Sequence, residues 1–583
     1  MPPSPSPKTP SRSDSDDEKK DLSLPLVDGV PAFTTDAVLP TLSPEEEEKR
    51  RKEAVVGGLH RALSSRQVSM ISIAGTIGTG LFLGTGGALA TGGPGSLLVN
   101  YSIVGGLIFL LIHCVGEMVT QFPVAGAWPA YIAKFVDEPA AFAYGWLSVL
   151  GLSIAMAGEL TATQLLMAYW TDRLMWLPAL FFMVGLLGTN LVTVKAYGEL
   201  EYWLSLLKVI AIVIFFFLGI AVNAGANTTC THIGAQYWTV NEAPFVDGFA
   251  GFASLFVTAA FAYGGTESVG MAAAETKNPT RNISRIANRV FFRIIFFYIL
   301  TVILIGFDIP YNFPNLASGT TATSPFTIVF DKAGAKAGGS FMNAVILTSI
   351  LSACNMSLFG SSRVLYGMAL RGHAPSIFCR LTKRGVPWAA LLAVVSLSFV
   401  FFGISFAPGG AAKIWTYAQS LVGVNNQFGW VFIGLSSWRM RRAWIKQGKP
   451  LTSLKCPNLA GSYGAPIVVV AFSFIILIQG WSSFKGGFHA EKFVQSYSSP
   501  VLTHPSHPSS STLPLVVEIP VLAVLYFSFR FIKGSRTPSL DELDLVTGEH
   551  DDNNEEDVED NAKVERREGG RLGWAWKVYS WVA

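Results

Sequence analysis

The sequence predicts an all-α polytopic membrane protein. Of its 583 residues, 50% are hydrophobic and only 14% are charged, against ~25% charged residues in soluble domains. The charges gather near the two ends, as in residues 45–52 (EEEEKRRK), and long stretches between them are nearly uncharged. The net charge of +3 does not favour a nucleic-acid-binding protein. Five cysteines without a CxxC spacing favour neither a disulfide scaffold nor a metal site, and no cofactor is expected.

Twelve windows are long and apolar enough for membrane helices, which need ~20 such residues to cross the ~30 Å hydrocarbon core. They lie at 68–91, 95–119, 140–170, 177–194, 200–222, 246–273, 287–309, 341–368, 387–407, 414–437, 464–482 and 513–532. We therefore expect a transmembrane domain over 66–532, between a disordered tail (1–65) and a second tail (533–583). The first tail is rich in Ser and Pro and lacks the basic-then-apolar order of a signal peptide.

The loop charges predict the orientation of these helices. With a cytoplasmic N-terminus, the inner loops hold fifteen Lys and Arg residues and the outer loops only six. Because positive charge favours the cytoplasmic side, both tails are expected there. The Asn227-Thr-Thr sequence then lies in an outer loop, where glycosylation can occur.

Two predicted spans contain sequences that weaken a continuous helix. The first carries Gly75, Thr76, Ile77, Gly78, Thr79 and Gly80, and glycine costs about 1 kcal/mol per position inside a helix. The sixth carries Phe261, Ala262, Tyr263, Gly264, Gly265, Thr266 and Glu267. One interpretation is close packing of helices through small residues. The other is a pair of discontinuous helices at matching places in a five-plus-five inverted repeat, followed by two extra C-terminal helices.

A pair of broken helices has a specific chemical use. Free N–H groups after Gly78 and the positive end of the helix dipole can hold a carboxylate. Free carbonyls near Tyr263 and Gly264 can receive an ammonium group. An α-amino acid carries both charges a few ångströms apart, so we expect the backbone at these breaks to bind one.

Three ionisable residues lie at membrane depth, where a charge costs ~2.5–3.5 kcal/mol, and they are the candidates for proton coupling. Glu159 is far from either end of its span, although it is also compatible with a protonated, purely structural carboxyl. Lys208 has no acid at i±3 or i±4, although its side chain is long enough to extend to the interface. Glu267 follows the second break, where stabilisation by the helix dipole is an alternative explanation. Ser352 and Asn355, with the threonines of the breaks, are expected to line the binding site, unless their side chains bond to their own helices.

Several motifs, in family order from about 60 to 550, resemble those of fungal amino-acid permeases (the yeast amino acid transporter family of the amino acid–polyamine–organocation superfamily). They are IAGTIGTGLFLGTG (73–86), QFPVAGAW (121–128), FAYGGTESVGMAAAETKNPTRN (261–282), the stretch 343–375 and WRMRRAWIKQG (438–448). The resemblance implies a leucine-transporter-like fold and proton-coupled amino-acid import across the plasma membrane. It implies Glu at position 159 and a lysine at 208 where sodium-coupled relatives hold a cation. The implied partners are the amino acid, protons, the lipid bilayer, and cytosolic ubiquitin or trafficking machinery.

Substrate choice stays open at this point. The stretch 343–355 is most similar to basic amino-acid permeases, and Glu159 suits lysine or arginine, but Gly151 and Asn425-Asn426 depart from the family pattern. A neutral or broad specificity is the alternative, and a non-transporting sensor is an alternative of another class, although sensors carry a longer tail. HExxH, GxSxG and P-loop patterns do not occur in the sequence, so an enzyme is not expected.

One segment does not fit the family. Residues 498–516 (SSPVLTHPSHPSSSTLPLV) form a Ser/Pro/His-rich insertion before the last predicted span. We interpret it either as a translated short intron or as a tolerated surface insertion, since longer loops add little closure cost.

Overall fold

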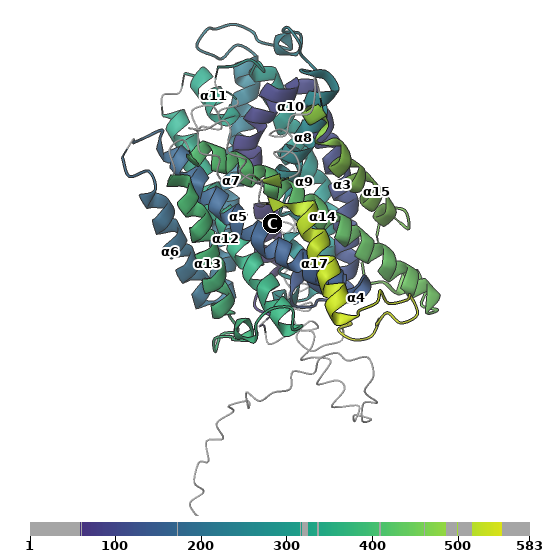
Figure 1. Ribbon diagram of the computed structural model, residues 1–583. Coiled ribbons are helices and arrows are strands. Elements are labelled where there is room, and N and C mark those ends of the chain that lie inside the picture. Colours follow the sequence, from purple (N-terminus) through teal and green to yellow (C-terminus); the bar gives the residue numbers. More distant parts are fainter. Residues whose placement is uncertain are drawn as a thin grey trace, which may run out of the picture. The chain divides into compact units, whose positions relative to one another are not determined.

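The computed structural model describes residues 59, 61–171, 173–314, 316, 324–334, 337–406, 410–456, 458–459, 461–484, 498–499 and 516–550. Most of this part of the chain is helical, and the long helices run side by side in Figure 1. The predicted N-terminal tail, apart from its last few residues, and residues 551–583 lie outside the described residues.

The first five predicted spans form helices in the expected order. The first is divided into α2 and the π-helical turn η1, and a short helix, α4, separates the second from the third. The elements are α2 (Ser65–Thr76), η1 (Gly80–Gly84), α3 (Thr85–Gln121), α4 (Ala127–Phe135), α5 (Glu138–Met167), α6 (Leu177–Val192) and α7 (Val194–Asn223). The boundary between the first two spans is a kink inside α3, where Gly93 has φ 78° directly before Pro94.

The next five spans repeat this order of features, with a divided first helix and a short helix, α11, between the second and third. The elements are α8 (Gly248–Tyr263), η3 (Thr266–Gly270), η4 (Ala273–Glu275), α9 (Pro279–Ile294), η5 (Ile295–Ile299), α10 (Leu300–Asp308), α11 (Pro325–Lys332), α12 (Gly338–Leu370), α13 (Trp388–Gly403) and α14 (Gly410–Lys446). The last two helices are α15 (Gly464–Ile478) and α17 (Glu518–Lys533), and short 3-10 turns lie at Gln236–Trp238 (η2), Ser376–Cys379 (η8), Ile404–Phe406 (η9), Leu451–Ser453 (η10) and Trp481–Phe484 (η11).

Each of the twelve apolar windows overlaps one or more of these helices, and two of the windows contain a break. Within the described residues, seven segments are long and apolar enough to cross a membrane, and one of them, Ser65–Gln121, contains two of the predicted windows. Two shorter apolar helices, α6 and α15, accompany them. Large apolar side chains such as Phe181, Phe217 and Leu477 are more than 70% exposed. Exposed apolar surface of this extent suits contact with lipid.

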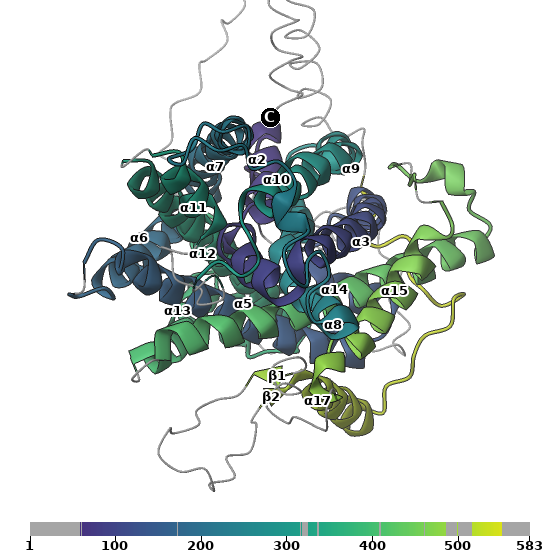
Figure 2. The same cartoon turned by 90° about the horizontal axis from the view of Figure 1, so that it is seen from above.

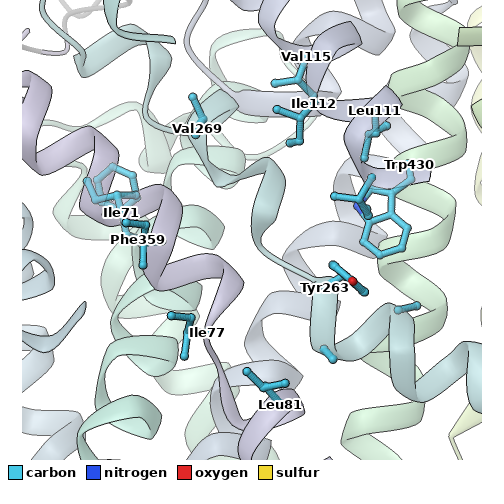
Figure 3. Packing of buried hydrophobic residues seen from close by; sticks show 14 of the residues in the cluster. Ile71, Ile77, Leu81, Leu111, Ile112, Val115, Tyr263, Val269, Phe359 and Trp430 are labelled. Atoms are coloured by element: carbon cyan, nitrogen blue, oxygen red, sulfur yellow. The ribbon is translucent and has the colours of Figure 1, made fainter. Parts of the chain in front are cut away.

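The divided helices lie inside the group of helices. α2 packs against α7, α12, α9 and η3, and α8 packs against α3 and α14. Seen from above, α6 and α17 lie at the edge of the group (Figure 2). Ile71, Ile77 and Leu81 follow the first divided helix through its break, and Tyr263 marks the end of α8; all four are buried (Figure 3).

Part of the predicted C-terminal tail is packed against the helices. We call residues 536–550 the C-terminal strap; its Leu543 and Leu545 are 4% and 1% exposed. The side chains that bond to it come from α4, from the end of α14 and from the loop after it. For example, Lys134 donates to the Thr547 carbonyl at 2.8 Å, and Gln447 donates to the Leu543 carbonyl at 2.8 Å. The first part of the predicted tail 533–583 is thus packed against the helices, and the residues that follow the strap lie outside the described part of the chain.

The segment 498–516 is described only at its two ends. Ser498–Ser499 (β1) pairs antiparallel with Val516–Val517 (β2), directly before α17. The residues between these strands lie outside the described part of the chain, so the choice between an insertion and a retained intron stays a prediction.

Candidate functional site

The first break separates α2 from η1. The last helical bond of α2 runs from the Ile77 N–H to the Ile73 carbonyl, and Ile77 then leaves helical geometry (φ −108°, ψ 88°). Leu81 and Phe82 both donate to the Gly78 carbonyl, which starts the next helical turn. The N–H groups of Gly78, Thr79 and Gly80 therefore belong to the first turn of a new helix, where the backbone has no partner within the helix. A Cβ added to Gly78 would meet no atom within 4 Å, so there is open space beside this backbone.

The second break follows α8. The helix ends at Tyr263, Gly264 is extended (ψ 140°), and Gly265 has φ 89°. L-residues rarely adopt this left-handed conformation, which is why glycine suits this turn. The short 3-10 helix η3 then begins at Thr266. Both sequence-predicted breaks are therefore present in the structure.

The two breaks touch each other through glycines. A Cβ on Gly75 would lie 2.2 Å from the Gly265 carbonyl oxygen, and a Cβ on Gly80 would lie 2.5 Å from the Ala262 Cα. Real Cβ atoms do not approach other atoms so closely. Both interpretations of the glycine-rich sequence therefore apply. The glycines interrupt the helix, and they also allow backbone-to-backbone packing between the two divided helices.

Side chains already occupy the carbonyls at the end of α8. Tyr298 donates to the Ala262 carbonyl at 2.8 Å, Thr266 Oγ1 to the Tyr263 carbonyl at 2.5 Å, and Asn426 to the Ala260 carbonyl at 3.3 Å. A carbonyl oxygen has two lone pairs, so each can still accept a second hydrogen bond. An ammonium group at this helix end would therefore share these oxygens with protein donors instead of finding them free.

Glu159 connects the first break to a cavity. Thr79 Oγ1 donates to Glu159 Oε1 at 2.5 Å, and Glu159 is only 6% exposed. Its other oxygen, Oε2, is buried and has no hydrogen-bond partner among the described residues. The cavity beside it is lined by Ala155, Gly158, Glu159, Phe261, Trp415, Ala418, Gln419 and Val422, from α5, α8 and α14. Inside this cavity, the centre of a water molecule can move through a volume of about 10 Å³. The cavity therefore has room for about one water molecule and is too small for an amino acid.

Lys208 lies on the other side of the same break. Its Nζ donates to the Ile77 carbonyl at 2.9 Å, to Ser352 Oγ at 2.8 Å and to the Ala74 carbonyl at 3.3 Å. The side chain is fully buried, so it does not extend to the interface in this structure. A cation here also suits the negative end of the α2 dipole. Glu159 and Lys208 thus bond to the two ends of one helix break.

The structure reveals an acid, Glu201, that the sequence reasoning missed. Glu201 is fully buried and accepts hydrogen bonds from Ser352 Oγ and, at 2.7 Å, from Asn355 Nδ2. Asn355 in turn accepts one from Asn190 at 2.8 Å. Glu201 lies at i−7 from Lys208, outside the i±3 and i±4 positions but on the same helix face. That spacing is the signal that could have found it.

The other predicted site residues take separate places. Phe261 lines the cavity, whereas Tyr263 is fully buried, stacks on Tyr298 with ring centroids 3.9 Å apart, and donates to the Tyr101 carbonyl. Of these two aromatic residues, Phe261 alone lines the cavity. Glu267 Oε2 accepts a hydrogen bond from Trp430 Nε1 at 3.2 Å. Asn355 belongs to the Glu201 network and not to the residues that line the cavity, and the Thr76 side chain lies outside the described part.

Gly151 and Asn425, which both depart from the family pattern, pack against each other. A Cβ on Gly151 would lie 2.8 Å from Asn425, whose Nδ2 donates to the Leu147 carbonyl at 3.1 Å. The absence of a side chain at Gly151 therefore makes room for Asn425. Asn426, the next residue, reaches the end of α8.

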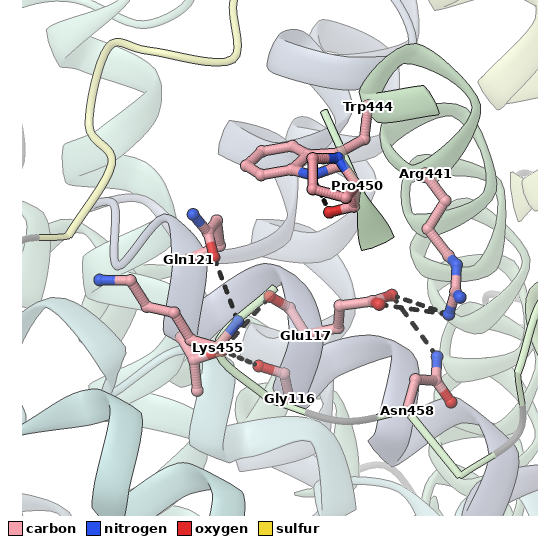
Figure 4. Close-up of polar contacts among 9 residues, drawn as sticks. Gly116, Glu117, Gln121, Arg441, Trp444, Pro450, Lys455 and Asn458 are labelled. Atoms are coloured by element: carbon pink, nitrogen blue, oxygen red, sulfur yellow. Dashed lines mark hydrogen bonds and ion pairs between the residues drawn. The ribbon is translucent and has the colours of Figure 1, made fainter. Parts of the chain in front are cut away.

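A polar cluster joins α3 to the end of α14. Glu117 pairs with Arg441 at 3.2 Å and accepts from Asn458 at 3.5 Å, and the Lys455 N–H donates to Gln121 Oε1 (Figure 4). Arg441 lies on α14, because this helix continues to Lys446, beyond the expected end of the span at 437.

Comparisons with known proteins agree with this architecture. Residues 67–504 match the family model described as amino acid permease. A probable amino-acid permease of Schizosaccharomyces pombe is 35% identical, over 84% of this chain and 95% of its own length. The amino-acid permease GAP3 of Candida albicans is 37% identical (78% and 77%), and the lysine-specific permease LysP of Escherichia coli is 32% identical (82% and 94%). The chain belongs to the amino acid permease family, an integral membrane family, and these relatives are named as permeases and not as enzymes.

Proposed function

We propose that this protein imports amino acids together with protons by alternating access, with both tails in the cytoplasm and the plasma membrane as its location. The observation that carries the proposal is the contact between two interrupted helices beside a buried acid. Gly75 and Gly80 meet Gly265 and Ala262 backbone to backbone, and Glu159 bonds to the restart of the first helix.

The α-carboxylate group of the substrate is assigned to the first break, and its α-ammonium group to the second. The N–H groups of Gly78, Thr79 and Gly80 point the positive end of a helix at the open space beside Gly78. The last carbonyls of α8, with the Thr266 and Tyr298 donors already on them, form the negative end for the ammonium group. This arrangement recognises what all α-amino acids share, and the side chain extends into the region lined by Phe261 and Glu159.

The cavity supports a closed state with no room for the substrate. Because it holds about one water molecule, the surrounding helices have to separate before an amino acid enters. The helices separate when spans one, two, six and seven reorient against spans three, four, eight and nine, around a fixed binding site. The recurring order of a divided helix, a long helix, a short helix (α4 or α11) and three further helices supports a five-plus-five repeat. Twelve crossings and this repeat are part of the proposal.

Glu159 and Lys208 are assigned to proton coupling. Both are buried, both bond to the first break, and a proton on either changes the charge at the place where the substrate binds. One proton that moves down 100 mV supplies ~2.3 kcal/mol, enough for roughly fifty-fold accumulation.

A preference for lysine or arginine is the finer part of the proposal. The carboxylate of Glu159 has a free oxygen, Oε2, among the described residues, and it lines the cavity where the substrate side chain is expected. Two relatives are named as lysine-specific permeases and a third as a cationic amino acid transporter. Neutral or broad specificity is the competing proposal, because Phe261 and Trp415 make most of the remaining lining apolar.

Uptake of radiolabelled lysine into proteoliposomes tests the proposal. The assay uses an imposed pH gradient, with the twenty amino acids as competitors and two external pH values. Uphill uptake that collapses with a protonophore supports transport with proton coupling. Saturable binding without any flux would favour a non-transporting sensor, and strong competition by leucine but not arginine would favour the neutral specificity.

A further inference from the structure

We propose that Glu201 is a second proton-accepting group, which takes the proton from Lys208 through the Ser352 hydroxyl. This inference rests on the proposed proton-coupled function and adds the route by which the proton leaves the site.

The three side chains form a continuous hydrogen-bonded chain. Lys208 Nζ donates to Ser352 Oγ at 2.8 Å, and the Ser352 hydroxyl donates to Glu201 Oε1. Asn355 holds the other oxygen of Glu201 with a bond of 2.7 Å. All four side chains are fully buried. A hydroxyl group can form this link, because it accepts one proton and donates another.

The proton step is balanced in atoms and charge. The Lys208 ammonium gives one proton to Ser352 Oγ while Ser352 gives its original hydroxyl proton to Glu201 Oε1. One N–H and one O–H bond break, and two O–H bonds form. The products are a neutral amine, an intact serine and a neutral carboxyl. The pair changes from two opposite charges to none, so it no longer carries the desolvation cost of two buried ions.

Position gives the relay a direction. Glu201 lies seven residues before Lys208 on α7, so it is ~10 Å nearer the start of this helix. In the proposed orientation α7 starts at the cytoplasmic side. Glu159 contacts the opposite side of the first break, where the cavity lies. A proton therefore has acceptors on both sides of Lys208, one toward the cavity and one toward the cytoplasm.

Other charged groups around α7 do not replace Lys208 in this role. Arg363 on α12 is engaged with Glu275 at 3.1 Å, and Arg66 pairs with Glu199. Among the described residues, no lysine or arginine forms a direct ion pair with Glu201. The other titratable and charged side chains on α7 are Lys195, Tyr197, Glu199 and Tyr202. Those that face it from neighbouring elements include Arg66 on α2, Glu159 on α5, Arg363 with Glu275, and, toward its far end, Asp308, Asp331 and Lys332.

The test compares Glu201→Gln with Glu199→Gln, an acid-to-amide change two residues away at a half-exposed position. Full-length protein in liposomes is assayed for lysine exchange at equal pH on both sides and for lysine-driven proton movement with a trapped pH dye. We expect Glu201→Gln to keep exchange within about two-fold and to lose proton movement at least ten-fold. Glu199→Gln should keep both. Ser352→Ala should behave like Glu201→Gln, and Ser352→Thr, which retains a hydroxyl, should restore proton movement.

The outcomes separate this inference from the function on which it rests. Wild-type protein that exchanges lysine without any proton movement would overturn the proposed coupling itself. Normal proton movement in Glu201→Gln, with a coupled wild type, would overturn the relay alone. A third outcome would also overturn the relay. In it, Glu201→Gln loses exchange and proton movement equally, and Ser352→Thr moves no more protons than Ser352→Ala. That result would show that these residues act only in packing.

Discussion

Thr79 donates a 2.5 Å hydrogen bond to Glu159, and this bond joins the restart of the first divided helix to α5. Through it, the protonation state of one buried carboxyl affects the backbone that we assign to the substrate carboxylate. Lys208 bonds to the opposite end of the same break through the Ile77 carbonyl. The break is thus held by an acid on one side and by a base on the other.

Glu159→Gln should reduce uphill lysine uptake at least ten-fold. Glutamine keeps an oxygen that accepts from Thr79, so the fold should persist, but the side chain no longer takes up a proton or attracts a cation. Uptake in proteoliposomes under a pH gradient measures the effect, and Glu242→Gln, at an exposed position, is the control. Unchanged uphill uptake by Glu159→Gln would remove this residue from the coupling mechanism.

Lys208→Ala should also abolish uphill uptake while it spares exchange. The substitution removes the ammonium group that bonds to the Ala74 and Ile77 carbonyls and with it the exchangeable proton. Exchange needs no net proton movement, so it should fall by less than about five-fold. Lys195→Ala, at an exposed position on the same helix, should leave both activities unchanged. If Lys208→Ala still concentrates lysine, the assignment is wrong.

Gly75→Ala should destabilise the protein strongly. Its Cβ would lie 2.2 Å from the Gly265 carbonyl oxygen, a backbone atom that cannot move aside alone. Overpacking of this kind costs about 3 kcal/mol. Gly87→Ala is the matched control, because a Cβ there meets nothing within 4 Å. The melting temperature of the detergent-solubilised protein should fall in the first variant and not in the second. Equal melting temperatures would mean that the two breaks do not touch.

Asn227 should carry no glycan in the folded protein, although its sequence permits one. Its side chain is 8% exposed, and Nδ2 donates to the Val222 and Thr231 carbonyls at 2.9 and 2.7 Å. A glycan on this nitrogen would disrupt the turn. Protein from a eukaryotic host should show no mobility shift after endoglycosidase treatment, and Asn227→Asp should lower the melting temperature by removing both bonds. A shift that Asn227→Gln abolishes would contradict this turn.

Detachment of the C-terminal strap should lower stability and should depend on pH. Burial by itself raises the pKa of Asp544, but the Lys134 charge and the N–H groups of Thr547 and Val546 lower it below its ordinary value of 3.8 overall. The stabilisation is therefore complete above pH 4 and is lost as the pH falls through the lowered pKa.

Leu545→Asp should lower the melting temperature at pH 7, whereas the exposed Val546→Asp should not. Equal effects would show that the strap does not pack.

Most of the helical architecture could be predicted from the sequence, because apolar windows of fixed length report directly on membrane helices. The two breaks were predictable from glycine density, and the burial of Glu159 and Lys208 from their places inside apolar windows. The contacts of Tyr263 and Asn355 were not, since a sequence does not show which way a residue on a broken helix faces. Glu201 lies seven residues before Lys208 on the same helix, beyond the i±3 and i±4 spacings, and its hydrogen-bond partner Ser352 comes from a helix about 150 residues away. The strap was missed because its few leucines are spaced within an acidic, polar segment.

The most direct test of the central claim is a high-resolution cryo-electron microscopy map of the protein with bound lysine. We predict the lysine carboxylate within hydrogen-bonding distance of the Gly78–Gly80 N–H groups, and its α-ammonium group at the last carbonyls of α8. A map with continuous helical hydrogen bonding through both segments, or with lysine bound elsewhere, would contradict the account.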